Sequence, residues 1–148
     1  MSQGLSARQR WAHIALGMQQ DVAAYGALQT MLSEQFHAAL RHDAAAMQAV
    51  AQRITAQAQA LEQSRLQRVA HARALLPAGT PVTMTALFAL LQAPLQQQLR
   101  NLWRQLEALV QHCKALNVRN CQLIMEQAQT MRQVLGGGNH EEGIYGPG

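Results

Sequence analysis

Histidine and cysteine are the residues through which this chain could bind a metal, and their spacing does not favour such a site. Six histidines occur, but none belongs to a His-Glu-x-x-His pattern, and no Cys-x-x-Cys pair is present. Cys113 and Cys121 lie eight apart on one expected helix, which separates their Cα atoms by about 12 Å, whereas a disulfide spans about 7 Å. We expect no metal site and no disulfide between these cysteines.

The carboxylates and glycines give equally little indication of catalysis. The glutamates at 34, 62, 107 and 126 are isolated from one another in sequence, so nothing suggests a paired acid and base, although two could meet in the fold. The three glycines at 136–138 lack the following Lys-Ser/Thr of a phosphate loop, and no serine stands in a nucleophile elbow. We expect a protein that is not an enzyme and that carries no catalytic residue and no cofactor.

Asn117 and Asn120 are the most informative polar residues, because they lie three apart within an apolar stripe. Buried without a partner, either side chain would cost ~1–3 kcal/mol, so each should be hydrogen-bonded or reach water. Two interpretations remain open. The pair could fix the register of a helical seam, or it could line a groove and bond to polar groups of a partner helix.

That stripe has a seven-residue spacing and covers three columns of the C-terminal third. The columns are Leu102, Leu109, Leu116 and Leu123; then Leu99, Leu106, Cys113 and Asn120; then Trp103, Val110, Asn117, Ile124 and Met131. At roughly 100° per residue they span about 160° of a helix, which is wider than a two-stranded seam requires. Such a face can pack within its own domain and leave apolar surface for another helix.

The composition predicts an all-α protein. Hydrophobic residues make up 49% of the 148 residues and aromatic residues only 4%, while alanine and glutamine, both good helix formers, fill much of the remainder. No stretch approaches the roughly 18 uninterrupted apolar residues of a membrane span, and the polar interruptions near the N-terminus do not suit a signal peptide. We expect a cytoplasmic protein without membrane insertion.

The net charge of +4 raises the possibility of nucleic-acid binding. The basic residues are spread along the chain, and the densest group, at 65, 68 and 73, is not interleaved with aromatic residues or set in a known motif. The pattern favours solvated helix faces over a nucleic-acid partner.

Four helical segments are expected. A capping box at Ser6 begins a first helix that continues to Leu40, and Asp43 caps or kinks the entry to a second, which ends before the break at 77–81. These two helices either run on or fold back as a hairpin. A short helix follows at 84–91, and the last runs from about 94 to 135 before the glycines. We expect one elongated antiparallel bundle or hairpin of long helices with coiled-coil-like packing over residues 1–135, and a flexible tail at 136–148.

In its layout, the chain resembles the FlgN family of flagellar export chaperones. That family has an asparagine pair before an aliphatic doublet, as at 117–124 here, a leucine-rich acidic pattern like that at 28–43, and a terminal tyrosine and glycine like those at 145–148. Cys121 replaces a glycine common in the family, and Gln57 a lysine. The resemblance covers nearly the whole chain.

The resemblance implies a chaperone of hook-associated proteins, which join the flagellar hook to the filament. It would bind their disordered, helix-forming terminal segments, prevent premature assembly and deliver them to the flagellar export apparatus. The expected partner-binding residues are Leu109, Leu116, Asn117, Asn120, Leu123, Ile124, Met131 and Val134, with the two asparagines fixing register and Tyr145 as a candidate latch. Two alternatives stay open. One is a structural coiled-coil or scaffold protein whose permanent partner could be a second copy of the chain, as a homo-oligomer, and the other is a stalk-type component of a related secretion system.

Overall fold

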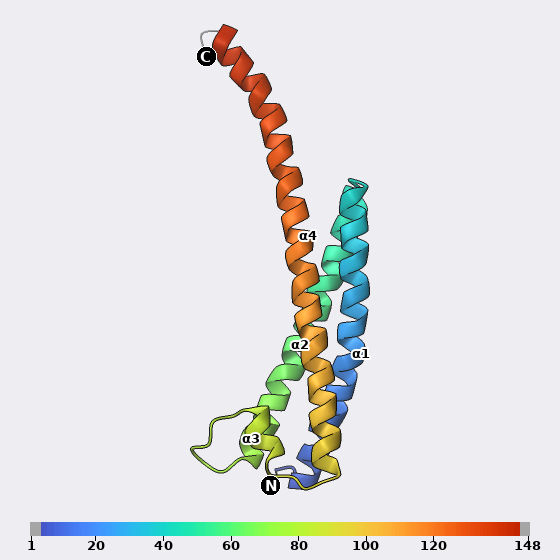
Figure 1. Ribbon diagram of the computed structural model, residues 1–148, viewed down its shortest axis with the longest axis vertical. Coiled ribbons are helices and arrows are strands. Elements are labelled where there is room, and N and C mark those ends of the chain that lie inside the picture. The colour runs from blue at the N-terminus through green and yellow to red at the C-terminus, as the bar shows by residue number, and fades with distance from the viewer. Residues whose placement is uncertain (1–3, 146–148) are drawn as a thin grey trace.

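The computed structural model describes the backbone of residues 4–145 and the side chains of residues 4–136. Its four helices are α1 (Ala7–Leu40), α2 (Ala44–Leu75), α3 (Met84–Phe88) and α4 (Leu95–Tyr145), and this described part contains no strand. As Figure 1 shows, α2 returns antiparallel to α1, α3 lies at the end that holds the start of α1, and α4 runs back beside α1 and past the α1–α2 turn. The expected all-α bundle is confirmed: α1 and α2 form its antiparallel hairpin, while α4 runs parallel to α1.

Local capping explains where α1 begins and where it turns into α2. The Ser6 Oγ accepts a hydrogen bond from the Gln9 backbone N–H at 3.1 Å, and the Gln9 side chain accepts one from the Ser6 N–H, which confirms the capping box. At the other end, His42 adopts a positive φ of 54°, and the Asp43 N–H donates to the Ala38 carbonyl at 3.0 Å. This Schellman arrangement stops α1, and Asp43 then caps α2, so the two helices form a hairpin.

The core is built around α1. Ile14 and Met18 of α1 join Leu106 of α4 in a cluster at the α3 end, and this cluster is completed by Ala72, Leu76, Leu87, Phe88 and Leu99. Nearer the α1–α2 turn, Leu28 and Leu32 join a second cluster with Leu61 and Cys113. In the described chain, α1 packs closely along both α2 and α4, whereas the backbones of α2 and α4 stay apart and only their side chains meet. Consequently α4 is attached to the hairpin by a single face.

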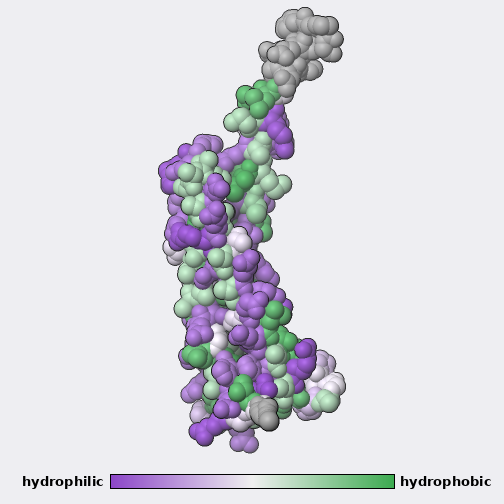
Figure 2. Space-filling view, turned by 180° about the vertical axis from the view of Figure 1, so that it is seen from behind, coloured by the Kyte–Doolittle hydropathy of each residue, from purple (hydrophilic) through white to green (hydrophobic). Residues whose placement is uncertain are grey.

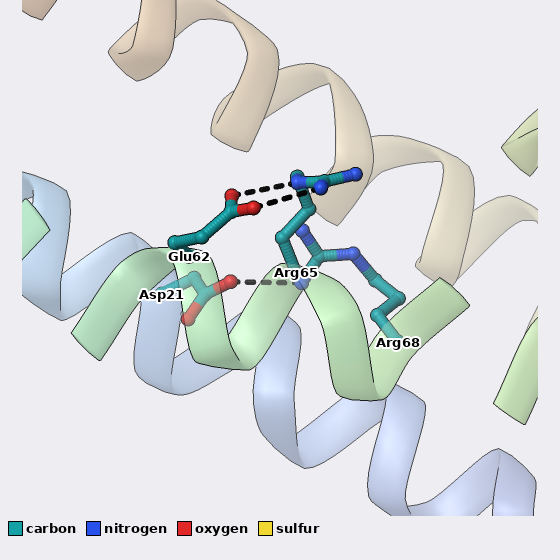
Figure 3. Close-up of polar contacts among 4 residues, drawn as sticks. All are labelled: Asp21, Glu62, Arg65 and Arg68. Carbon is teal, nitrogen blue, oxygen red and sulfur yellow. Dashed lines mark hydrogen bonds and ion pairs between the residues drawn. The ribbon is translucent and has the colours of Figure 1, made fainter. Parts of the chain in front are cut away.

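A nearly buried ion pair braces the three long helices. Arg68 Nη1 of α2 donates to Asp21 Oδ2 of α1 at 2.8 Å, and the same guanidinium lies 5.6 Å from the centroid of the Trp103 ring on α4. Figure 3 shows this pair beside the exposed pair of Glu62 and Arg65. Removing one partner of a buried pair would leave an uncompensated charge, so the contact constrains how the helices are aligned.

Two predicted helix ends are wrong. The short helix α3 ends at Phe88 rather than Leu91, and α4 remains helical to Tyr145 instead of ending at Leu135. Glycine lowers helix stability by about 1 kcal/mol relative to alanine, but its backbone can adopt helical angles, so the three glycines do not by themselves end a helix. The division into a domain at 1–135 and a flexible tail at 136–148 stays a prediction. Over the described residues, none of the helices combines the length and apolar character that crossing a membrane requires.

At the α3 end, the rings of His13 and His71 stack with their centroids 5.1 Å apart. Arg10 Nη1 lies 3.2 Å from His71 Nδ1, so it can donate to the neutral ring. Burial, together with the neighbouring His13 and Arg10, lowers the pKa of His71 below its ordinary value of 6.5. Protonating His71 would place its charge beside the Arg10 guanidinium.

This arrangement predicts that His71 makes the fold less stable in acid. Because the pKa is lower in the folded chain, the unfolded chain takes up the proton first, so stability is complete above about pH 6.5 and is lost as the pH falls below it. His71→Gln should flatten the pH dependence of the urea midpoint between about pH 5 and 7. His112→Gln, at an exposed position of α4, serves as the control and should follow the wild type. An unchanged pH profile for His71→Gln would contradict the prediction.

Candidate partner-binding surface of α4

The middle column of the predicted stripe is the seam between α4 and α1. Leu99, Leu106, Cys113 and Asn120 have exposed fractions of 5%, 2%, 5% and 1%. Their seven-residue spacing keeps them on one side of the helix, as in coiled-coil packing. Burial raises the pKa of the Cys113 thiol. Neither Cys113 nor Cys121 forms a disulfide. The centre of the wide apolar face is therefore its most deeply buried part.

One flank of the seam consists of the leucine column. Leu102, Leu109, Leu116 and Leu123 are all half-buried. Leu102 packs against the cluster at the α3 end, and Leu116 packs against the cluster near the turn. These leucines thus contribute to the core while part of each side chain reaches the surface.

The opposite flank faces a groove between α2 and α4. Two adjoining hollows of about 410 and 250 Å³ share Tyr25 and Leu28 of α1, Ala58 of α2 and Val110 of α4. The groove exists because α2 and α4 both pack on α1 while their backbones stay apart from each other. Burial, followed by the charge of Asp21, raises the pKa of Tyr25 above its ordinary value of 10.0. Asn117 lines the end of the groove nearer the turn.

The two asparagines have different environments. Asn120 Nδ2 donates to the Leu32 carbonyl at 2.7 Å and to Gln35 Oε1 at 2.9 Å, and its own Oδ1 accepts from Arg119. Asn117 is exposed. Asn120 therefore fastens α4 to α1 within the chain, and only Asn117 presents its side chain to solvent.

Two neighbouring contacts were not predicted from the sequence. Gln127 Nε2 donates to the Ala39 carbonyl at 2.8 Å, and the Arg119 guanidinium lies 3.8 Å from the centroid of the Phe36 ring. Glutamine is so frequent in this chain that no pattern distinguished Gln127. The position of Arg119 between the two asparagines is the one sequence feature that could have indicated its contact with Phe36. Together these contacts hold α4 as far as the last turn of α1.

Beyond Gln127, α4 projects past the α1–α2 turn, and we call residues 128–136 the projecting segment (Figure 1). Every residue of this segment is exposed, including Met131 at 59%, Val134 at 66% and Leu135 at 62%. Figure 2 shows hydrophobic atoms on this part of α4, just below the grey atoms. Leu135 was not among the predicted site residues, although its spacing of four from Met131 places both on one helix face.

The remaining predicted residues connect these surfaces. Leu123 and Ile124 are half-buried, on the two flanks of α4 just before the projecting segment. Tyr145 lies outside the residues whose side chains are described, so its role as a latch stays a prediction. The surface offers helical apolar side chains without catalytic groups, and no three metal-ligating side chains meet in the described part of the chain.

The different environments of the asparagines predict different effects on stability. Asn120→Ala should lower the free energy of unfolding by about 1–3 kcal/mol, because it leaves buried polar groups of α1 without their partner. Asn117→Ala should change it by less than about 0.5 kcal/mol, as expected for an exposed side chain. Urea unfolding followed by circular dichroism measures both, and equal effects would contradict the assignment of the seam.

Comparison with protein families agrees with this architecture. The family described as FlgN protein matches residues 14–147, which is nearly the whole chain. Comparison with curated proteins gives no match, and neither does comparison with solved structures. The family is one of chaperones and not of enzymes. The long helices, the unfilled flanks of α4 and this family match lead to one conclusion: the chain belongs to the FlgN family of flagellar export chaperones.

Proposed function

We propose that the chain binds the disordered, helix-forming terminal segments of hook-associated proteins in the cytoplasm. In this proposal it prevents their premature assembly and brings them to the flagellar export apparatus. The observation that carries the proposal is the projecting segment, where Met131, Val134 and Leu135 are exposed on a helix that nothing else in the described chain covers. An amphipathic helix of a client would bury these side chains in the helix-in-groove manner.

The size of the exposed surface suits reversible binding. Burying one large aliphatic side chain contributes about 1.5–3 kcal/mol, and three such side chains lie on the projecting segment. Ordering a disordered client segment costs about 2–5 kcal/mol, which offsets much of that gain. The balance favours a moderate affinity, as a cargo that must be released requires.

The half-buried flanks would extend the contact toward the hairpin. Ile124 lies between the projecting segment and Asn117, which lines the end of the groove. A client helix could therefore continue from the projecting segment into the groove. On the other flank, Leu109, Leu116 and Leu123 offer a parallel row of partly exposed side chains. Asn120 would act by fixing α4 on α1, which keeps both rows in register. A latch by Tyr145 would require the helix to break near the glycines.

Substituting the projecting segment tests this proposal. Met131→Asp and Val134→Asp should each weaken binding of a hook-associated terminal segment by about tenfold or more, because either places a charge in the apolar contact. Leu66→Asp, at an exposed leucine of α2, is the matched control and should leave the affinity unchanged. Titration calorimetry measures the affinities, and circular dichroism checks that each variant remains folded.

Two results would contradict the proposal. One is unchanged client binding by both α4 variants. The other is that the wild type forms a stable dimer in light scattering, that the α4 variants are monomers, and that neither binds the client segment. The second result would favour the scaffold interpretation, in which the exposed segment pairs with its own copy.

A further inference from the structure

The positive charge of this chain is concentrated at the α3 end of the molecule. The parts of the chain at this end are residues 4–20 and 63–106, which contain seven arginines and no acidic residue. The other described side chains, at 21–62 and 107–136, carry five basic and six acidic residues. The net charge of +4 therefore comes from one end of an elongated molecule (Figure 1).

Only two of the seven arginines are neutralised by carboxylates in the described structure. Arg68 pairs with Asp21 and Arg65 with Glu62, and both carboxylates lie at the border of the α3 end (Figure 3). The other five make no ion pair with described residues: Arg8, Arg10, Arg73, Arg100 and Arg104. Arg10 and Arg104 instead bond to the neutral side chains of His71 and Asn101.

Exposed leucines accompany these arginines. Leu5 precedes α1, Leu90 follows α3 and Leu95 begins α4, and all three are exposed. Gln96 Nε2 donates to the Phe88 carbonyl at 2.9 Å, which ties the start of α4 to the end of α3. Apolar side chains and unpaired cations thus share one end of the protein.

We propose that the α3 end is a second docking surface, which takes an acidic protein segment with leucine-like side chains among its carboxylates. Unpaired arginines attract such a segment over a distance and fix its orientation, while the exposed leucines give it apolar contact. The charge is complementary because three carboxylates lie at the border of the α3 end, of which Asp21 and Glu62 are already paired and only Glu107 is not, against five arginines without an ion pair. This inference is independent of the proposed client contact.

The side chains at this end suit a protein better than a nucleic acid or a membrane. Single-stranded nucleic acid stacks on exposed aromatic rings, whereas Trp11 and Trp103 here pack against the core. A membrane surface is bound by a helix that lies flat with its apolar face outward. The short helix α3 instead buries Leu87 and Phe88.

The two surfaces lie at opposite ends of α4. Arg104 and Met131 are separated by about 40 Å along the helix at ~1.5 Å per residue. An acidic partner at the α3 end and a client at the projecting segment can therefore be held simultaneously.

A synthetic helical peptide with a leucine stripe and glutamates elsewhere tests the surface, with a companion in which glutamine replaces glutamate. The triple variant Arg8→Gln, Arg73→Gln, Arg104→Gln removes three exposed charges at the α3 end. The triple variant Arg41→Gln, Lys114→Gln, Arg132→Gln removes three exposed charges elsewhere and matches it in net charge. Fluorescence anisotropy measures the affinity of the peptides, with circular dichroism as the check on folding.

We expect wild type to bind the glutamate peptide more tightly than the glutamine peptide. The first triple variant should lose about tenfold or more of this affinity, and the matched variant less than about twofold. Equal losses in both, or no binding of the glutamate peptide, would overturn the proposal. So would binding of duplex DNA or anionic phosphatidylserine vesicles that depends on the α3-end arginines while the peptide does not bind. The first triple variant should keep its affinity for a hook-associated segment, which separates this test from that of the proposed function.

Discussion

The seam between α1 and α4 is the contact on which the other features of this protein depend. It joins α4 to the hairpin through one column of side chains and is closed near the turn by Asn120 and Gln127, which both donate to α1 carbonyls. Because the backbones of α2 and α4 stay apart in the described chain, only side chains such as Arg68 bridge them, and the flanks of α4 are only partly covered. A seam this narrow holds a long helix in register and still leaves much of its apolar face open.

The length of the helices then determines what is exposed. α1 has 34 residues and α4 has 51, so α4 continues past the turn after its last bond to α1. The molecule consequently has two different ends, with uncovered aliphatic side chains at one and unpaired arginines at the other. For an export chaperone, this separation would allow a client and a second protein to be bound without competing for the same side chains.

Much of this fold follows from local sequence signals. Other parts of it could not be predicted, and each of these failures has a physical reason. Ser6 and Asp43 cap α1 and α2 at the positions that the sequence predicts. The seven-residue columns identify the apolar face of α4. The columns cannot reveal which of them meets α1, because all three share one period. Asn120 was recognised as important, but its partners, Leu32 and Gln35, lie 85 or more residues away in sequence. The sequence does not reveal that α4 continues past Leu135, because a run of glycines is typical of helix ends although each glycine costs a helix only about 1 kcal/mol.

Thiol labelling of single cysteines measures the exposure of the projecting segment most directly. With Cys113 and Cys121 replaced by alanine, Leu135→Cys should react with a thiol reagent at close to the rate of the unfolded chain, at every protein concentration tested. Leu106→Cys, in the seam, should be strongly protected in the folded protein, since Leu106 is 2% exposed. Protection of Leu135→Cys comparable to that of Leu106→Cys, or protection that grows with protein concentration, would contradict the account, because the apolar end of α4 would then already be covered.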